Sequence, residues 1–223
     1  SLYPRVFFVE SCMRIYLDLD NTLIATHTFY QDYYRPLLIA GGSTEREIEK
    51  SYTFFTNGVT RASGELFTPR RQMEILGWRD SVREEALNKV ENILREKRGF
   101  IFPEVVSALT ELKQRGAYLV VLTFGHPELQ KQKLIASGMG HFFDEVIITN
   151  ENKANLLRAA AAEVKEKIFF VDDRSQYMTE LQNDDAIVTV HMSRPEIGAE
   201  CLDKKCGAKH EIQNLNELLA FIH

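Results

Sequence analysis

The chain has 223 residues, 44% of them hydrophobic, and a formal net charge of −5 at pH 7. A chain of this length and composition can bury a sizeable core without crosslinks. The acidic balance argues against an electrostatic surface for nucleic acid or for an anionic membrane, and no apolar run approaches the ~18 residues that span a bilayer. We therefore expect a small molecule as the partner, with no nucleic-acid polymer and no membrane, while the oligomeric state stays open.

Residues 1–12 contain one arginine, a short apolar stretch and no small-residue cleavage site, so no secretory signal is expected there. They fit either an edge strand or an extension ahead of a start at Met13, and the sequence does not decide between the two. Residues 14–23, Arg-Ile-Tyr-Leu-Asp-Leu-Asp-Asn-Thr-Leu, form a short apolar run that indicates a buried strand ending in a loop.

Two aspartates, Asp18 and Asp20, close this first strand. Because side chains alternate along a strand, both carboxylates project to the same side wherever the extended geometry persists. Two such groups repel each other unless a cation lies between them or one of them keeps a proton. A polar strand end that merely caps the next turn is the alternative interpretation.

Asp-Leu-Asp-Asn-Thr of residues 18–22 resembles the first motif, Asp-x-Asp-x-Thr after an apolar strand, of the haloacid dehalogenase-like (HAD) hydrolase superfamily. Members of this superfamily share four short motifs in a fixed order. The resemblance therefore implies that three more motifs follow along the chain.

The region from Ala25 to residue 101 has a helical pattern, is rich in aromatic and charged residues, and contains no alternating strand. Two capping boxes predict helix starts, Thr44 with Glu47 and Ser81 with Glu84. Turns are expected at Gly41-Gly42 and Asn57-Gly58. We predict a helical cap domain over residues 25–101, inserted into an α/β core domain of residues 1–24 and 102–223. Its candidates for meeting a carboxylate or a second phosphate of the substrate are Arg35, Arg61, Arg70 and Arg71.

From residue 102 onward the pattern alternates between helix and strand. The expected strands cover residues 117–122, 145–149, 168–171 and 187–191. The expected helices cover residues 103–115, 127–137 and 153–165, with an amphipathic closing helix over 215–222. This alternation predicts an α/β fold with a doubly wound parallel sheet, a Rossmann-like core under the helical cap. Residues 194–209 lack periodicity and are expected to form a surface loop.

Cys12, Cys201 and Cys206 are an odd number of cysteines without dense spacing, which favours free thiols in a reducing compartment. We therefore predict a cytoplasmic protein. The two later cysteines, together with His191 and His210, follow none of the usual zinc spacings, so no zinc site is predicted there.

Two single residues match the second and third motifs. Thr123 ends a strand with a hydroxyl that can donate to a phosphate oxygen, although Phe124 follows where many phosphatases of the superfamily have asparagine. Lys153 opens a helix at the place of the motif lysine, with Ala154 in place of a frequent proline. Lys165 and Lys167 are the alternatives, less suited because they lie at the far end of that helix.

The fourth motif is the apolar strand of residues 168–171, which ends in Asp172-Asp173. Two acidic strand ends in one sheet are unstable without a cation, and hard carboxylate oxygens suit Mg²⁺. We expect Asp18 and Asp172 to be direct ligands and Asp173 to act through water. The resemblance adds the backbone carbonyl of Asp20 as a further metal ligand.

The resemblance also implies catalytic roles. Asp18 attacks phosphorus and forms an aspartyl phosphate, while Asp20 protonates the leaving group and later takes a proton from water. Thr123 and Lys153 screen the phosphoryl charge together with Mg²⁺, and Thr22 orients the loop and Asp20.

The presence of Asp20 favours phosphoryl transfer over dehalogenation, because a halide leaves without protonation. The sequence therefore predicts a HAD-type phosphatase with a helical (C1-type) cap, which hydrolyses a small-molecule phosphate monoester with Mg²⁺. A phosphomutase on the same scaffold and a catalytically weak phosphate-binding regulatory protein are the alternatives.

Overall fold

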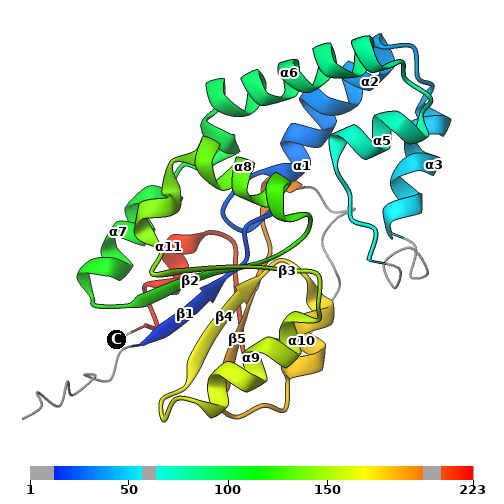
Figure 1. Ribbon diagram of the computed structural model, residues 1–223. Helices are drawn as coiled ribbons and strands as arrows, with labels where there is room; N and C mark the ends of the chain where they lie inside the picture. The colour runs from blue at the N-terminus through cyan, green and yellow to red at the C-terminus, as the bar shows by residue number, and fades with distance from the viewer. Residues whose placement is uncertain (1–12, 57–63, 198–206, 223) are drawn as a thin grey trace, which may run out of the picture.

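The computed structural model describes residues 13–56, 64–197 and 207–222, and its centre is one parallel sheet (Figure 1). The strands are β1 (Arg14–Leu17), β2 (Tyr118–Phe124), β3 (Glu145–Thr149), β4 (Ile168–Asp172), β5 (Ile187–Met192) and β6 (His210–Ile212). Their order across the sheet is β3-β2-β1-β4-β5-β6. The chain thus winds outward from β1 in one direction and then from β4 in the other, which confirms the predicted doubly wound α/β fold. Ligands of such sheets bind where the winding reverses, here between β1 and β4.

Helices cover both faces of the sheet, as expected for buried parallel strands. The helices that follow residue 104 are α7 (Val105–Gln114), α8 (Pro127–Ser137), η3 (Met139–Phe142), α9 (Lys153–Ala162), α10 (Ser175–Leu181), η4 (Pro195–Ile197) and α11 (Leu215–Leu218). Leu17 and Val171 belong to the core cluster that also contains residues of α7 and α11, whereas Tyr16 and Phe170 belong to the cluster with α9 and α10. The alternation of side chains along β1 and β4 therefore fills two cores at once.

Residues 25–101 contribute helices to the structure and, among the described residues, no named strand. They are α1 (Thr26–Phe29), the π-helix η1 (Tyr30–Tyr34), α2 (Arg35–Ala40), α3 (Glu45–Thr56), α5 (Pro69–Ile75), α6 (Asp80–Glu96) and the 3-10 helix η2 (Arg98–Phe100). Their buried core consists of Phe29, Tyr34, Leu38, Ile48, Met73, Ala86, Val90 and Leu94. Figure 1 shows these helices beyond the carboxyl ends of the strands. The boundaries of a cap domain at residues 25 and 101 stay a prediction.

One of the two predicted capping boxes is confirmed. The backbone N–H of Thr44 donates to Glu47 Oε2 at 2.8 Å, and the N–H of Glu47 donates to Thr44 Oγ1 at 3.4 Å. The box at Ser81 is wrong, because α6 begins at Asp80 after an extended Arg79, so Ser81 already lies in the first turn.

Of the predicted surface loop over residues 194–209, residues 198–206 lie outside the described part of the chain, and the expectation is wrong at its start, where Arg194 and Ile197 are buried. Arg194 is 1% exposed, with its guanidinium 2.6 Å from a Glu104 carboxylate oxygen and 3.7 Å from the centre of the Phe102 ring. Just after the predicted loop, residues 210–212 form a sixth strand, β6, which is too short to produce an alternating pattern in the sequence. The helix α10 was likewise not predicted, and the closing helix is shorter than expected.

Several features of the sequence lie outside the described residues: residues 1–12, the turn at Asn57-Gly58, Arg61, Cys201 and Cys206. Within the described ranges, no helix combines the length and the apolar character that crossing a bilayer requires.

Two connections join the helices of residues 25–101 to the sheet, and they run side by side. Ile24 and Ile101 form an antiparallel bridge, and the N–H of Ala25 donates to the carbonyl of Phe100 at 2.8 Å. The second connection turns through Gly99 at φ +62°, where a Cβ would lie 2.8 Å from the backbone nitrogen of Ser137 in α8. Glycine is therefore needed there both for its backbone angle and for the close approach to α8.

We predict that Gly99→Ala destabilises the fold more than Gly138→Ala does. Gly138 has a similar φ of +69° but nothing within 4 Å of its Cβ position. Both variants incur the left-handed penalty of about 1–2 kcal/mol. Gly99→Ala adds a backbone clash, expected to cost at least about 1 kcal/mol more. Urea unfolding of the two variants measures the difference, and equal losses would contradict the close approach.

Candidate active site

Asp18 and Asp172 lie next to each other at the carboxyl ends of the two central strands. Leu17 of β1 is paired with Val171 of β4, and the N–H of Asp18 donates to the carbonyl of Val171 at 2.9 Å. One residue further along, both aspartates therefore stand at the same level on the same face of the sheet. Asp18 is 5% exposed and Asp172 is fully buried, so two carboxylates share a site with little water.

Lys153 bridges these two carboxylates. Its Nζ lies 2.5 Å from Asp18 Oδ1 and 2.7 Å from Asp172 Oδ2. The side chain of Asn152 caps α9 by accepting from the N–H of Ala154, which starts the helix with Lys153 at its first position. Burial alone would lower the pKa of Lys153, but the two aspartates raise it above its ordinary value, so the ammonium stays charged.

The alternative lysines, Lys165 and Lys167, are exposed beyond the other end of α9. The structure therefore brings together the predicted nucleophile, the predicted motif lysine and the first acidic residue of the fourth motif. Because β1 and β4 are far apart in the sequence, their register is what assembles this group.

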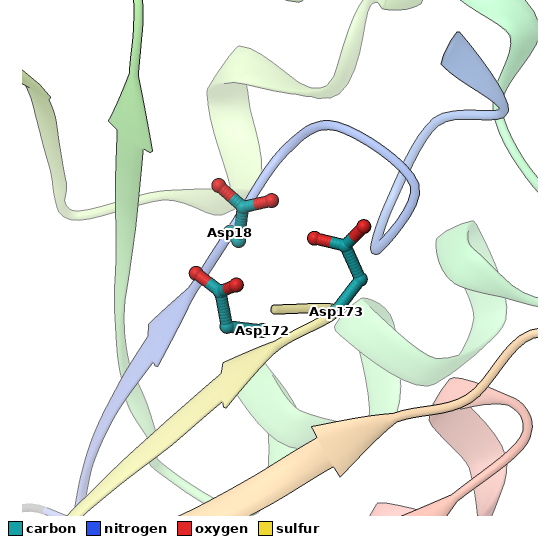
Figure 2. Close-up of side chains that lie close together, drawn as sticks. All are labelled: Asp18, Asp172 and Asp173. Atoms are coloured by element: carbon teal, nitrogen blue, oxygen red, sulfur yellow. The ribbon is translucent and has the colours of Figure 1, made fainter. Parts of the chain in front are cut away.

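Asp173 completes a cluster of three carboxylates. One oxygen from each of Asp18, Asp172 and Asp173 lies within 4.8 Å of the others, and Figure 2 shows the three side chains extending from the ends of β1 and β4. Burial, followed by the charge of Asp172, raises the pKa of Asp18 to about 7 despite Lys153. Burial, followed by the charges of Asp172 and Asp18, raises the pKa of Asp173 well above its ordinary value. The cluster therefore has more negative charge than its surroundings neutralise.

This donor set fits a magnesium ion. Mg²⁺ binds hard carboxylate oxygens and needs only one or two of them from the protein. The three aspartates offer such oxygens, and a divalent cation would supply the positive charge that the raised pKa values of Asp18 and Asp173 show to be missing. The predicted ligand role of the Asp20 backbone carbonyl, and the water between the ion and Asp173, stay predictions.

The carboxyl group of Asp20 is not part of this cluster. The strand β1 ends at Leu17, and Asp20 pairs with Ile24 in the following loop, so strand alternation does not set the direction of its side chain. Its Oδ1 accepts from Lys133 Nζ at 2.6 Å and from the Thr26 hydroxyl, and its Oδ2 accepts from Gln130 Nε2 at 2.7 Å. Burial alone would raise the pKa of Asp20, but Lys133 and these hydrogen bonds lower it below its ordinary value.

Thr123 is buried near the end of β2 and is connected to Asp20 through Gln130. Its Oγ1 accepts from Gln130 Nε2 at 2.6 Å, the same nitrogen that donates to Asp20. The role predicted for Thr22, orienting the Asp20 carboxylate, is not supported by a contact between the two side chains. The hydroxyl of Thr22 is buried without a hydrogen-bond partner in the described part of the chain, and Thr26 donates to Asp20 instead.

Sequence reasoning missed Gln130 and Lys133, which both belong to α8. The helix buries these two residues and Ser137, whereas its Ile135 is 78% exposed. The available signal was a row of polar residues at positions 130, 133 and 137, which share one helix face. The usual assumption that the apolar face of a helix is buried does not identify these residues, because in α8 the polar face is turned inward.

The described arginines that were candidates for binding the substrate form ion pairs with glutamates of the same chain. Arg70 pairs with Glu84, Arg71 with Glu65 and Glu74, and Arg35 with Glu45. Arg70 also lines a cleft of about 360 Å³ between α5, α6 and the start of α8, which includes His126 just after β2. The described structure therefore presents these arginines in ion pairs with their own chain.

A sheet of this strand order, with two lysine-bridged aspartates where the winding reverses, defines a Rossmann-like enzyme core with an acidic centre. The chain belongs to the haloacid dehalogenase-like hydrolase family, whose sequence model matches residues 14–176. This membership confirms the family that the four motifs resemble.

Known proteins similar to the chain include phosphatases and dehalogenases. The chain is 39% identical to a phosphoserine phosphatase of Thermus thermophilus over 69 residues, which is 30% of this chain and 28% of that relative. It is 44% identical to a glyceraldehyde 3-phosphate phosphatase of Methanothermobacter thermautotrophicus over 50 residues, 22% of each protein. Both alignments thus span less than a third of the relative's own length.

Solved structures match over almost the whole chain. The magnesium-bound HAD-hydrolase YfnB of Bacillus subtilis is 16% identical with a TM-score of 0.61, and the match covers 95% of this chain and 98% of that one. The L-2-haloacid dehalogenase of Xanthobacter autotrophicus is 13% identical with a TM-score of 0.62, covering 95% of this chain and 100% of that one. These likenesses show a common fold.

We predict that Mg²⁺ stabilises the protein more at high pH than at low pH. Without metal, the raised pKa of Asp18 means that the folded state binds more protons than the unfolded state between pH 3.8 and about 7, so this group's contribution to stability falls as pH rises through that window. A cation that binds the ionised carboxylates removes this loss. The Mg²⁺-induced rise in Tm should be larger at about pH 8 than at about pH 5.5 by roughly 3 °C or more.

Differential scanning calorimetry with Mg²⁺ and with EDTA at both pH values measures this difference. Comparing the two metal conditions at one pH cancels titrations elsewhere in the protein. Asp144→Asn is the matched control, because Asp144 pairs with Lys113 and lies outside the cluster, and it should leave the Mg²⁺ effect unchanged. An Mg²⁺ effect that is equal at both pH values would contradict the assignment of the cluster as the ion's site.

Proposed function

We propose that the chain is a Mg²⁺-dependent phosphatase that hydrolyses a small-molecule phosphate monoester through an aspartyl phosphate. The observation that carries this proposal is the bridge of Lys153 to both Asp18 and Asp172 at the reversal point of the sheet. This geometry gathers a carboxylate nucleophile, a fixed positive charge and a metal-ligating carboxylate around one point, as phosphoryl transfer requires.

In this mechanism Asp18 attacks the phosphorus atom in line with the leaving oxygen and becomes the aspartyl phosphate. Lys153 holds Asp18 Oδ1 at 2.5 Å, which orients the carboxylate and places an ammonium beside the phosphoryl oxygens. Thr123 offers its hydroxyl to a phosphoryl oxygen from the end of β2. Bound Mg²⁺, held by Asp18 and Asp172 and through water by Asp173, would neutralise charge on the phosphoryl group.

Asp20 carries the proton in both halves of the reaction. Its lowered pKa favours the ionised carboxylate. This is the form that takes a proton from the water attacking the aspartyl phosphate. In the first half it must deliver a proton to the leaving alkoxide. The negative charge of an arriving phosphate raises the pKa of a neighbouring carboxylate and thus favours the protonated form.

Asp20 argues for phosphate rather than haloacid as the substrate. A 2-haloacid needs no proton for its leaving halide, so Asp20 and its three hydrogen-bond donors would be without purpose in a dehalogenase. The alignments with two phosphatases support the same choice, although each covers less than a third of the relative.

The helices of residues 25–101 are proposed to act as a cap domain that excludes water and selects the substrate. They lie beyond the carboxyl ends of the strands, where the site is (Figure 1). The odd number of cysteines supports a cytoplasmic location.

We predict that Asp18→Asn abolishes release of phosphate from p-nitrophenyl phosphate, with a loss of about 10⁴-fold or more, because the amide cannot form the covalent intermediate. The wild type should require Mg²⁺ and lose activity in EDTA. Malachite-green assay of phosphate with a panel of natural phosphomonoesters then measures which substrate is preferred.

Asp144→Asn again serves as the control, since it removes a carboxylate far from the lysine bridge. Activity that survives Asp18→Asn would overturn the assignment of the nucleophile. A product that is an isomer of the substrate, formed without free phosphate, would identify a phosphomutase. Binding of a phosphate analogue with no turnover of any ester would identify a regulatory protein.

A further inference from the structure

We propose that Gln130 and Lys133 of α8 are positioning residues that hold the Asp20 carboxylate for proton transfer to the leaving group. This inference rests on the proposed function, and it assigns a role to a helix that contains none of the four family motifs. Neither residue needs to touch the substrate, because both act through Asp20.

The contacts fix the carboxylate on both of its oxygens. Lys133 Nζ is 2.6 Å from Oδ1 of Asp20, the Thr26 hydroxyl donates to that same oxygen, and Gln130 Nε2 is 2.7 Å from Oδ2. A carboxylate held at both ends cannot rotate freely about its Cβ–Cγ bond. The backbone of Asp20 is itself held by a bridge with Ile24, and Asn21 directly after it takes a left-handed φ of +58°, but the backbone does not set the Cβ–Cγ torsion.

The orientation of the Gln130 amide follows from chemistry. An ionised carboxylate only accepts hydrogen bonds, so the NH₂ group of Gln130 must face Asp20. The same nitrogen lies 2.6 Å from Thr123 Oγ1. Since Thr123 accepts this bond, its own O–H proton remains to donate to a phosphoryl oxygen. Gln130 therefore sets the acid and the phosphate-binding hydroxyl as one unit.

Burial shows that this arrangement is costly to the fold. Gln130 is 2% and Lys133 8% exposed, and Gln130 Oε1 is buried without a hydrogen-bond partner in the described residues. Burying an ammonium and leaving an amide oxygen unpaired both cost free energy. The same helix leaves Ile135 78% exposed. Leu134 and Ala136 of this helix pack against the cores, and the polar side chains of Gln130 and Lys133 are turned inward beside them to meet Asp20 and Thr123.

A test follows from the leaving group. Protonation by Asp20 matters for an alkoxide, which leaves poorly, and matters little for p-nitrophenolate, which leaves without a proton. If Gln130 and Lys133 position Asp20, Lys133→Met and Gln130→Met should lower kcat/KM for alkyl phosphates by about 10²-fold, the size of a general-acid contribution. This ratio reports formation of the aspartyl phosphate, whereas hydrolysis of that intermediate, in which Asp20 also takes part, is common to all substrates and enters kcat. With p-nitrophenyl phosphate the loss in kcat/KM should be within about 3-fold.

Lys131→Met is the matched control, because Lys131 lies on the same helix, is 58% exposed and pairs only with Glu128 among the described residues. It should leave both activities unchanged, and Lys133→Arg should recover part of the alkyl phosphate activity. Equal losses in kcat/KM for the two substrates would overturn the positioning role. Two variants are used so that a folding failure of one leaves the other to decide.

Crystal structures of the same variants separate this inference from the proposed function. Loss of Lys133 or Gln130 should turn the Asp20 carboxylate away from its present position, whether or not the wild type hydrolyses phosphate esters. A wild type that hydrolyses no ester would refute the proposed function alone. An Asp20 carboxylate that stays in place in both variant structures would refute the positioning role.

Discussion

The constraint on which the structure depends is the repulsion between Asp18 and Asp172, which strand register brings to the same level in a buried site. Lys153 relieves this repulsion by binding both carboxylates. Its Nζ can do so only if α9 begins at this residue, which the side chain of Asn152 ensures by capping the helix. Sheet order, helix start and charge balance are thus parts of one arrangement, and a change in any of them would leave a buried charge without a partner.

In a second ion pair, Asp20 with Lys133, the pKa of the carboxyl group is shifted in the opposite direction. At the cluster, burial and like charge raise the pKa of Asp18, whereas at Asp20 the ammonium and neutral donors lower it. Two carboxylates separated by one residue in the sequence therefore acquire different proton affinities from their surroundings. Such divergence is what enzymes use to give a pair of carboxylates different tasks.

The main strands and the acidic centre were predictable because their signals are local. The apolar runs that end in Asp18, Thr123 and Asp172 mark strands and their chemistry together. The polar row that contains Gln130 and Lys133 marks one face of α8, but it does not show that this face is buried, since that depends on which face of the helix meets the loop after β1. The prediction that Arg194 lies in a surface loop is wrong for a related reason. Its partners, Thr22 and Glu104, come from distant parts of the chain, and an arginine in an aperiodic stretch is normally exposed to solvent. Ion pairs between distant segments of the chain leave no periodic pattern in the sequence from which they could be predicted.

The two connections between the sheet and the helices of residues 25–101 meet at the bridge between Ile24 and Ile101. Because the polypeptide leaves and re-enters the sheet through one hydrogen-bonded bridge, the segment between can be lengthened, shortened or exchanged without altering the register of any strand. Arg194 reinforces this junction by binding the Thr22 carbonyl before it and Glu104 after it. The acidic centre of the sheet and the helices of residues 25–101 can thus change in sequence at different rates.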